Sequence, residues 1–219
     1  MKNRDYKQFA EGEYYHIFNR GVGKMDIFLD EQDFLFFLKR LKENIHPERM
    51  PLSGSGFRGA PSPGSYVREL LPENSFELIC YCLMPNHFHL VIKQLSSISI
   101  SKLIAKVCTS YSMYFNKKYN RVGTLYQDQF KAVHVADDEY LLWLSVYIHQ
   151  NPHVAGLVKN LKDWKWGSYP DYIGARQGSL CKKDVVLERF KTSREYADFV
   201  DSGFDIIKSK GELKDFVLD

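Results

Sequence analysis

Two apolar strands joined by a very short turn constrain the fold of this chain most. Residues 75–83 (SFELICYCL) and 87–94 (HFHLVIKQ) are rich in β-branched and aromatic side chains, and only Met-Pro-Asn separates them. A link this short can join antiparallel neighbours, whereas parallel strands need a crossover of a dozen or more residues. The two segments are therefore expected to pair as a β-hairpin within a larger sheet.

The other periodic segments predict the elements around this hairpin. Strands are expected at residues 13–22 and 130–135, and helices at residues 30–45, 97–118 and from residue 137 onward, with interruptions at Pro152 and Gly156. The order strand, helix, hairpin, helix, strand, helix is an α+β pattern. The nearest common architecture is a ferredoxin-like antiparallel sheet covered by helices.

Length and composition indicate one large domain with a small appendage. We expect the domain at residues 1–178, with a Gly/Ser/Pro-rich surface insertion at about residues 50–69, and a helical tail at residues 179–219. No apolar run approaches the roughly 18 residues that cross a bilayer. No secretory signal is visible, and the four cysteines form no disulfide-rich pattern. A cytoplasmic protein without a membrane partner is therefore expected, associated with the nucleoid when it binds DNA.

The second strand of the hairpin carries a pair of candidate metal ligands. Side chains at i and i+2 of a strand point to the same face, so His87 and His89 would lie side by side while Phe88 points into a core. Two neighbouring imidazoles can share a metal ion or a phosphate. The alternative is a half-exposed sheet face with incidental histidines, and the pair alone does not decide between them.

A second candidate group lies in the helix that contains SVYIHQNP. Tyr147 and Asn151 are spaced i, i+4, which places them on one helical face. A divalent ion held by two imidazoles and an amide could polarise a phosphodiester, which the tyrosine hydroxyl would attack to form a covalent intermediate. Because Asn151 precedes Pro152, the helix is at risk of ending there, in which case Gln150 or His149 would contribute instead.

Positive charge is concentrated in one part of the chain. The net charge is only +3, yet residues 93–136 hold seven basic residues and one acid, a local net charge of +6. Such a belt favours a polyanionic partner, although a solvated lysine-rich surface would look the same. The candidate contacts to a DNA backbone or to unpaired bases are Asn19, Arg20, Lys102, Lys106, Lys117, Lys118, Tyr119, Arg121, Tyr126 and Lys131.

Four segments together carry a family resemblance. YHIFNRGVGKMDIFLDEQDFLFFLKRL, CLMPNHFHLVIK, GTLYQDQFKAVHV and YIHQNPHVAGLV, in this order and spacing, resemble the HUH transposases with a single catalytic tyrosine. More narrowly, the chain is similar to the REP-associated tyrosine transposases. The resemblance covers about residues 13–174, which leaves the insertion and the tail outside the shared core.

The resemblance implies an HUH endonuclease-type core and a DNA strand-transfer enzyme. Such an enzyme acts on single-stranded DNA with hairpins and uses Mg²⁺ or Mn²⁺. His87 and His89 match the metal ligands, and Tyr147 matches the nucleophile that becomes a 5′-phosphotyrosine and leaves a free 3′-hydroxyl. Asn151 matches the third ligand, a glutamine in related single-tyrosine transposases. Related proteins are monomers or homodimers, so the resemblance leaves open whether Tyr147 serves its own histidines or those of a partner.

Two other functions remain compatible with the sequence. A domesticated descendant would bind hairpin DNA without moving any element. A structural zinc module that binds nucleic acid is the second alternative, because Cys80 and Cys82 share one strand face and His87 and His89 follow on the next strand. The spacing of these four residues is tight for a zinc site. Core cysteines are the simpler interpretation.

Overall fold

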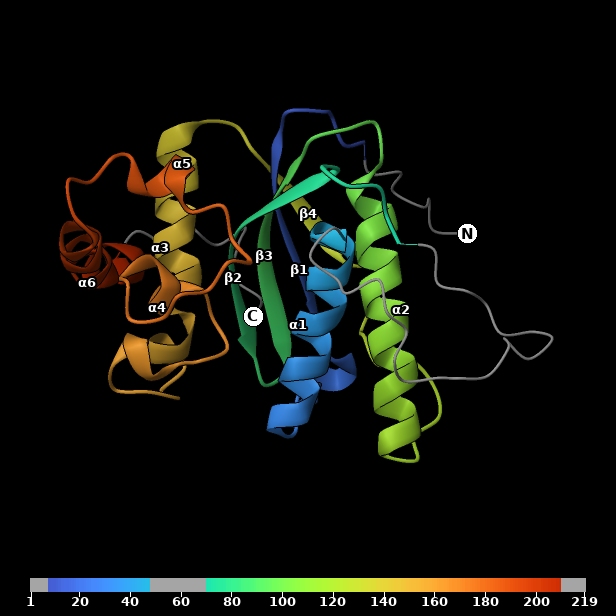
Figure 1. Cartoon of the computed structure of the whole chain (residues 1–219). Coiled ribbons are helices and arrows are strands. Elements are labelled where there is room, and N and C mark those ends of the chain that lie inside the picture. The colour runs from blue at the N-terminus through green and yellow to red at the C-terminus, as the bar shows by residue number, and fades with distance from the viewer. Residues whose placement is uncertain (1–7, 48–69, 210–219) are drawn as a thin grey trace.

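The computed structural model describes residues 8–47 and 70–209 (Figure 1). Within these ranges, no helix combines the length and apolarity that a bilayer span requires. The insertion predicted at residues 50–69 lies outside the described residues. The elements are, in chain order, β1 (Tyr14–Arg20), η1 (Val22–Lys24), α1 (Glu31–Ile45), β2 (Phe76–Met84), β3 (His87–Gln94), α2 (Ile100–Lys118), β4 (Lys131–Val135), α3 (Asp138–Val154), η3 (Leu161–Asp163), α4 (Tyr169–Tyr172), α5 (Asp184–Leu187) and α6 (Ser193–Ser209).

The four strands form a single antiparallel sheet in the order β2-β3-β1-β4. The predicted hairpin is present: β2 pairs with β3 across a turn at Pro85 and Asn86, with Met84 opposite His87. β1 then lies between β3 and β4, which is the strand order of a ferredoxin-like fold. The predicted α+β class and sheet architecture are therefore confirmed.

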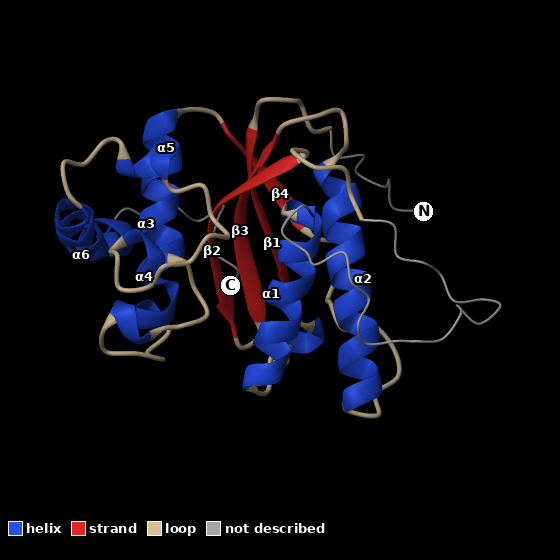
Figure 2. Cartoon of the chain, in the orientation of Figure 1, coloured by secondary structure: helices blue, strands red, loops and turns tan. Residues whose placement is uncertain are grey.

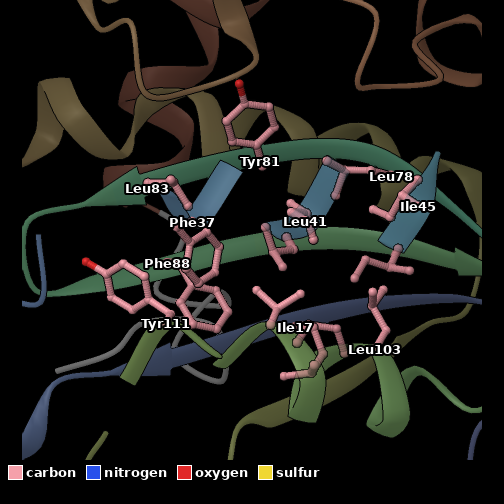
Figure 3. Close-up of a cluster of buried hydrophobic side chains, with 14 of the residues drawn as sticks. Ile17, Phe37, Leu41, Ile45, Leu78, Tyr81, Leu83, Phe88, Leu103 and Tyr111 are labelled. Carbon is pink, nitrogen blue, oxygen red and sulfur yellow. The ribbon is translucent and has the colours of Figure 1, made fainter. Parts of the chain in front are cut away.

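Helices cover both faces of the sheet. α1 and α2 lie against one face, and α3 with the shorter helices after it lies against the other (Figures 1 and 2). Between the sheet and the first pair of helices, Ile17 and Phe88 pack with Phe37, Leu41 and Tyr111 in one buried cluster (Figure 3). The opposite face of β3 is buried as well, so this strand is enclosed on both sides.

Paired carboxylates at the start of α1 connect the two helices of the first layer. Asp30 and Asp33 form a capping box, in which each side chain accepts from the backbone N–H of the other. Lys118, in the last turn of α2, bonds to both carboxylates, at 2.7 and 2.8 Å, and Tyr119 donates to Asp33 at 2.8 Å. The hydrogen bond from Lys118 lowers the pKa of Asp30. One buried carboxylate, Asp33, thus joins the N-terminus of α1 to the C-terminus of α2.

The third helix continues past the predicted interruption at Pro152 and ends at Val154. Proline there costs one backbone hydrogen bond in the last turn and leaves the rest of the helix unchanged. The helix is ended instead by Gly156, which has a φ of +70°. Gly156 N–H bonds to His153 and Leu157 N–H bonds to Pro152, the pattern of a Schellman motif. Asn151 is therefore helical, and the risk that its position before proline ends the helix is not realised.

The part of the tail that the structure describes packs on the third helix. Val186, Tyr196 and Val200 are buried in the same cluster as Leu144 and Ile148 of α3. The predicted helical character of this tail is present in α5 and α6. The domain boundary at residue 178 stays a prediction, but the tail shares a hydrophobic core with α3.

Replacing Asp33 with alanine should lower the free energy of unfolding by about 2–4 kcal/mol, because the substitution leaves Lys118 and two backbone N–H groups without their buried acceptor. Urea unfolding of the whole chain measures this. Glu31→Ala is the matched control, because Glu31 lies in the same turn of α1 as Asp33. This variant breaks the exposed pair with Lys165 and should lower the free energy of unfolding by less than about 1 kcal/mol. Equal losses in the two variants would contradict a structural role for Asp33.

Candidate active site

The two histidines of β3 lie on the face of the sheet that α3 covers. His89 is fully buried, and His87 is partly exposed. Their ring centroids are 5.0 Å apart with the rings nearly perpendicular, while Phe88 between them packs in the cluster on the opposite face. The strand alternation thus brings the two imidazoles together, as the sequence predicted.

The third helix brings Tyr147 and Asn151 to the same place. The ring of Tyr147 meets that of His89 edge-on, with centroids 5.7 Å apart. One turn later, the Asn151 side chain lies close enough to His87 to raise its pKa, and its amide donates to the Tyr147 carbonyl at 2.8 Å. All four predicted site residues therefore converge within one chain, from one strand and one helix.

Both histidines of the site are neutral at physiological pH. Burial lowers the pKa of His87 to about 4; the charge of Arg20 adds to this, and the Asn151 hydrogen bond opposes it. Burial also holds the pKa of His89 well below its usual range, with smaller contributions from His87 and His16. Metal binding requires the neutral, unprotonated nitrogen of imidazole, so this protonation state suits ligands.

The available donor atoms fit a divalent cation. Nε2 of His89 is buried and has no hydrogen-bond partner among the described residues. The other ring nitrogen, Nδ1, bonds to His16. Nδ1 of His87 lies 2.5 Å from Oδ1 of Asn86, which leaves the other ring nitrogen toward the site. In residues 8–47 and 70–209 no group of three or more His, Cys, Asp or Glu could hold a metal. The candidate donors are therefore two imidazole nitrogens and the Asn151 amide oxygen. Imidazole is a common ligand of transition metals, and amide oxygen also suits Mg²⁺ or Mn²⁺.

The zinc alternative finds no support in the geometry. Cys82 lies opposite His89 in the sheet, yet the cysteines and histidines do not assemble into a metal-binding group within the described part of the chain. The Cys82 thiol instead donates to the sulfur of Met84 at 3.6 Å. Burial raises the pKa of both Cys80 and Cys82, which disfavours the thiolate that zinc binds. Both cysteines are core residues.

The predicted cationic contacts separate into two groups in space. Arg20 lies opposite His87 in the sheet, and the ammonium of Lys131 lies 6.0 Å from the ring of Phe18 on the neighbouring strand. These two cations are near the histidines. The lysines of α2 (Lys102, Lys106 and Lys117) belong to the helix layer on the opposite face of the sheet.

The remaining predicted DNA contacts are engaged within the protein. Lys118 and Tyr119 bond to Asp30 and Asp33, as described above. Tyr126 packs edge-on against Phe88 with centroids 6.1 Å apart. Asn19 donates to the Asp128 carbonyl at 3.1 Å, and Arg121 bonds to Asn116 at 3.2 Å. These contacts hold loops and helix ends in place, so the structure does not present this group as a continuous surface with the histidines.

Two residues of the first strand lie beside the candidate site and were not among the predicted site residues. His16 and Phe18 project on the same face as His89, and Nε2 of His16 lies 2.9 Å from Nδ1 of His89. Burial lowers the pKa of His16 to about 3, so it too is neutral. The alternation of His16, Phe18 and Arg20 was visible in the sequence. The predicted ferredoxin-like sheet places β1 beside β3, but the sequence did not give the register that brings His16 to His89.

A buried polar network fixes the position of the helix that carries Tyr147. His149 bonds through Nδ1 to the Tyr196 hydroxyl of α6 at 2.7 Å and through Nε2 to Ser168 at 2.8 Å. Ser168 in turn accepts from the backbone N–H of Tyr81 in β2 at 2.9 Å. Gln150 points to α6 as well, where its amide donates to the carbonyl of Val200. His149 and Gln150 therefore anchor α3, and neither replaces Asn151 at the site.

The segment that contains the candidate site is similar to known transposases. The model of the IS200-like transposase family matches residues 60–151, a range that contains both histidines, Tyr147 and Asn151. A REP-associated tyrosine transposase of Haemophilus influenzae is 24% identical over 131 residues, which are 50% of this chain and 73% of the relative. A solved structure of a REP-associated tyrosine transposase bound to a REP hairpin has a TM-score of 0.54 at 14% identity, covering 83% of this chain and 95% of the other. The resemblance found in the sequence is confirmed, and the solved structure shares the fold.

The buried His149 should make the protein less stable in acid. Burial lowers its pKa from 6.5 to about 3, so below pH 6.5 the unfolded chain takes up a proton that the folded chain excludes. Stability is therefore full above pH 6.5 and falls toward pH 3, by about 1.4 kcal/mol per pH unit for this residue. Urea unfolding as a function of pH should show a shallower slope for His149→Gln than for the natural chain.

Tyr196→Phe is the control for this experiment. It removes a hydrogen-bond partner of His149 and keeps the titrating group, so stability should fall at every pH while the slope is retained. If His149→Gln had the same slope as the natural chain, the acid sensitivity would arise elsewhere.

Proposed function

From the relation of this chain to the IS200-like and REP-associated tyrosine transposases, we propose that it cleaves and rejoins single-stranded DNA beside hairpins, with Mg²⁺ or Mn²⁺ as cofactor. The observation that supports this most is the convergence of Tyr147 with His87 and His89 inside one chain. The solved relative was bound to a REP hairpin. Hairpin DNA as the substrate of this chain is part of the proposal.

Tyr147 is the proposed nucleophile. Its hydroxyl oxygen attacks a phosphodiester, a bond forms between that oxygen and phosphorus, and the bond from phosphorus to the 3′-oxygen breaks. The tyrosine gives up its proton, the departing 3′-oxygen takes one up as a free hydroxyl, and the 5′ end stays on the enzyme as a phosphotyrosine. Attack by a 3′-hydroxyl on the phosphotyrosine reverses these changes, which rejoins a strand and restores Tyr147.

The histidines and the amide are the proposed metal ligands. His87, His89 and Asn151 would hold the divalent ion, which supplies Lewis-acid polarisation of the scissile phosphate when it is bound. Because His89 is fully buried and the Asn151 amide donates to the Tyr147 carbonyl, both proposed ligands have their orientation fixed by the protein itself. Pre-oriented ligands keep the reacting atoms in place during the reaction.

The cations nearest the histidines are the proposed phosphate contacts. Arg20 lies opposite His87, and Lys131 extends over Phe18, so both can approach a DNA backbone that reaches Tyr147. Contacts of this kind position the strand without reading its sequence. The lysines on α2 belong to the other layer and would meet only more distant parts of the same DNA.

We also propose that Tyr147 acts with the histidines of its own chain. Its ring already contacts His89, and the network of His149, Tyr196 and Ser168 holds α3 against β2 and α6. Exchange of the helix with a partner would break this buried network. A monomer is then sufficient for cleavage.

Tyr147→Phe should abolish the covalent adduct while leaving DNA binding intact, because only the attacking oxygen is removed. The test incubates a labelled single-stranded hairpin oligonucleotide with Mn²⁺ and resolves the products on a denaturing gel. The natural chain should give a protein–DNA band, and Tyr147→Phe should give none. Tyr140→Phe, on the same helix, is the control that should retain the band. An adduct that persists in Tyr147→Phe would assign the nucleophile to another tyrosine.

His87→Ala should reduce Mn²⁺-dependent cleavage by at least about 100-fold, since even outer-shell partners of metal ligands contribute 10–100-fold. Binding of the same oligonucleotide, measured by gel shift without metal, should change only a few-fold. Cleavage at the natural rate in this variant would remove His87 from the metal site.

A further inference from the structure

A buried histidine of the first strand contacts a proposed metal ligand directly. His16 is completely buried on β1, and its Nε2 lies 2.9 Å from Nδ1 of His89 on β3. The two rings stack with centroids 5.1 Å apart and planes 20° apart. The residue opposite His89 is Phe18, and His16 lies two positions before it on the same face of β1, so the contact is a diagonal one across the two strands.

The contact restricts which nitrogen of His89 carries the proton. A neutral imidazole has one N–H, so in a bond between two neutral rings one nitrogen donates and the other accepts. If His16 donated, His89 would carry its proton on Nε2 and would have no lone pair there for a metal. If His89 donates through Nδ1, its Nε2 keeps a free lone pair. Only the second arrangement lets His89 bind a metal through Nε2.

We propose that His16 is a positioning residue that accepts the Nδ1 proton of His89 and thereby directs the Nε2 lone pair of His89 to the metal. This inference rests on the proposed function, because it assigns a role toward the metal of that site. A metal-binding histidine commonly donates its second N–H to a fixed acceptor, which sets its tautomer and its orientation. Here the acceptor is another histidine.

The packing around the pair gives His16 little freedom. Phe18 lies against both rings, with centroids 4.7 Å from His16 and 5.8 Å from His89. The three residues occupy adjacent strands in fixed register. Because Phe18 is also buried, the rings cannot turn away from each other without disturbing the sheet face.

The other proposed metal ligand has a different support. His87 is paired through Nδ1 with Asn86, its neighbour in the turn, and it is partly exposed. The loss of the His16 acceptor should therefore affect one of the two imidazole ligands and leave the second one in place. A partial loss of metal affinity, rather than its abolition, is the expected signature.

The test compares Mn²⁺ binding by the full chain, measured by calorimetry and by the electron paramagnetic resonance signal of free Mn²⁺. His16→Phe keeps an aromatic ring and removes the acceptor, so it should weaken binding about 10–100-fold. His16→Gln places an amide oxygen at a similar reach and should retain affinity within about threefold of the natural chain. His134→Phe, on the neighbouring strand at a half-exposed position paired with Glu13, is the control that should not change the affinity.

A second measurement needs neither activity nor metal. Nitrogen-15 NMR of the histidine rings in the metal-free protein reports which nitrogen of His89 is protonated. The expected result is a proton on Nδ1 in the natural chain, with loss of that preference in His16→Phe. A proton on Nε2 of His89 in the natural chain would overturn the inference. Should His16→Phe fail to fold, the natural chain and His16→Gln still decide the question.

The outcomes separate this inference from the proposed function. If the natural chain binds Mn²⁺ and His16→Phe binds it equally well, His16 has no positioning role and the proposed metal site stands. If the natural chain binds no Mn²⁺, the proposed cofactor is wrong, and the NMR measurement alone decides whether His16 sets the tautomer of His89.

Discussion

The burial of β3 on both faces determines the protonation and the hydrogen-bond partners of the histidines in the candidate site. The strand runs between a cluster shared with α1 and α2 and a second cluster shared with α3, so most side chains on either face lose contact with water, and His87 at its start keeps partial exposure. Desolvation keeps His87 and His89 neutral, and a neutral ring in a dry environment has only its neighbours as partners. The contacts with His16, Asn86 and Asn151 follow from that requirement. A half-exposed strand would leave the same histidines free to protonate and to turn.

Local patterns in the sequence were sufficient for most of the fold and for the centre of the site. The hairpin and the helices could be predicted because period and turn chemistry are local properties, and the alternation around Phe88 placed the two histidines on one face. The register between distant strands was not accessible in this way. The predicted ferredoxin-like sheet places β1 between β3 and β4, but no local signal gives the register that brings His16 to His89.

Two predictions about DNA contacts differ from the structure because they also depend on how distant segments pack. Tyr126 was a candidate for base stacking, but it packs on Phe88. The sequence alone does not show whether an aromatic side chain faces DNA or the core. Basic residues that are close in the sequence are likewise not always close in the folded protein. The belt of basic residues is divided by the sheet, with Arg20 and Lys131 near the histidines and the α2 lysines on the other side. Lys118 forms salt bridges with the carboxylates of Asp30 and Asp33.

The shared core of α3 and the tail has a consequence for how this protein can be divided. A chain ended at residue 178, where the sequence resemblance stops, would lack Tyr196 and Val200, which supply a partner for His149 and one for Gln150. The side of α3 that packs against α6 would then face water, and the helix that carries Tyr147 would lose one of its two supports. Part of the tail that lies outside the sequence resemblance therefore belongs to the same packed core as the helix that carries Tyr147.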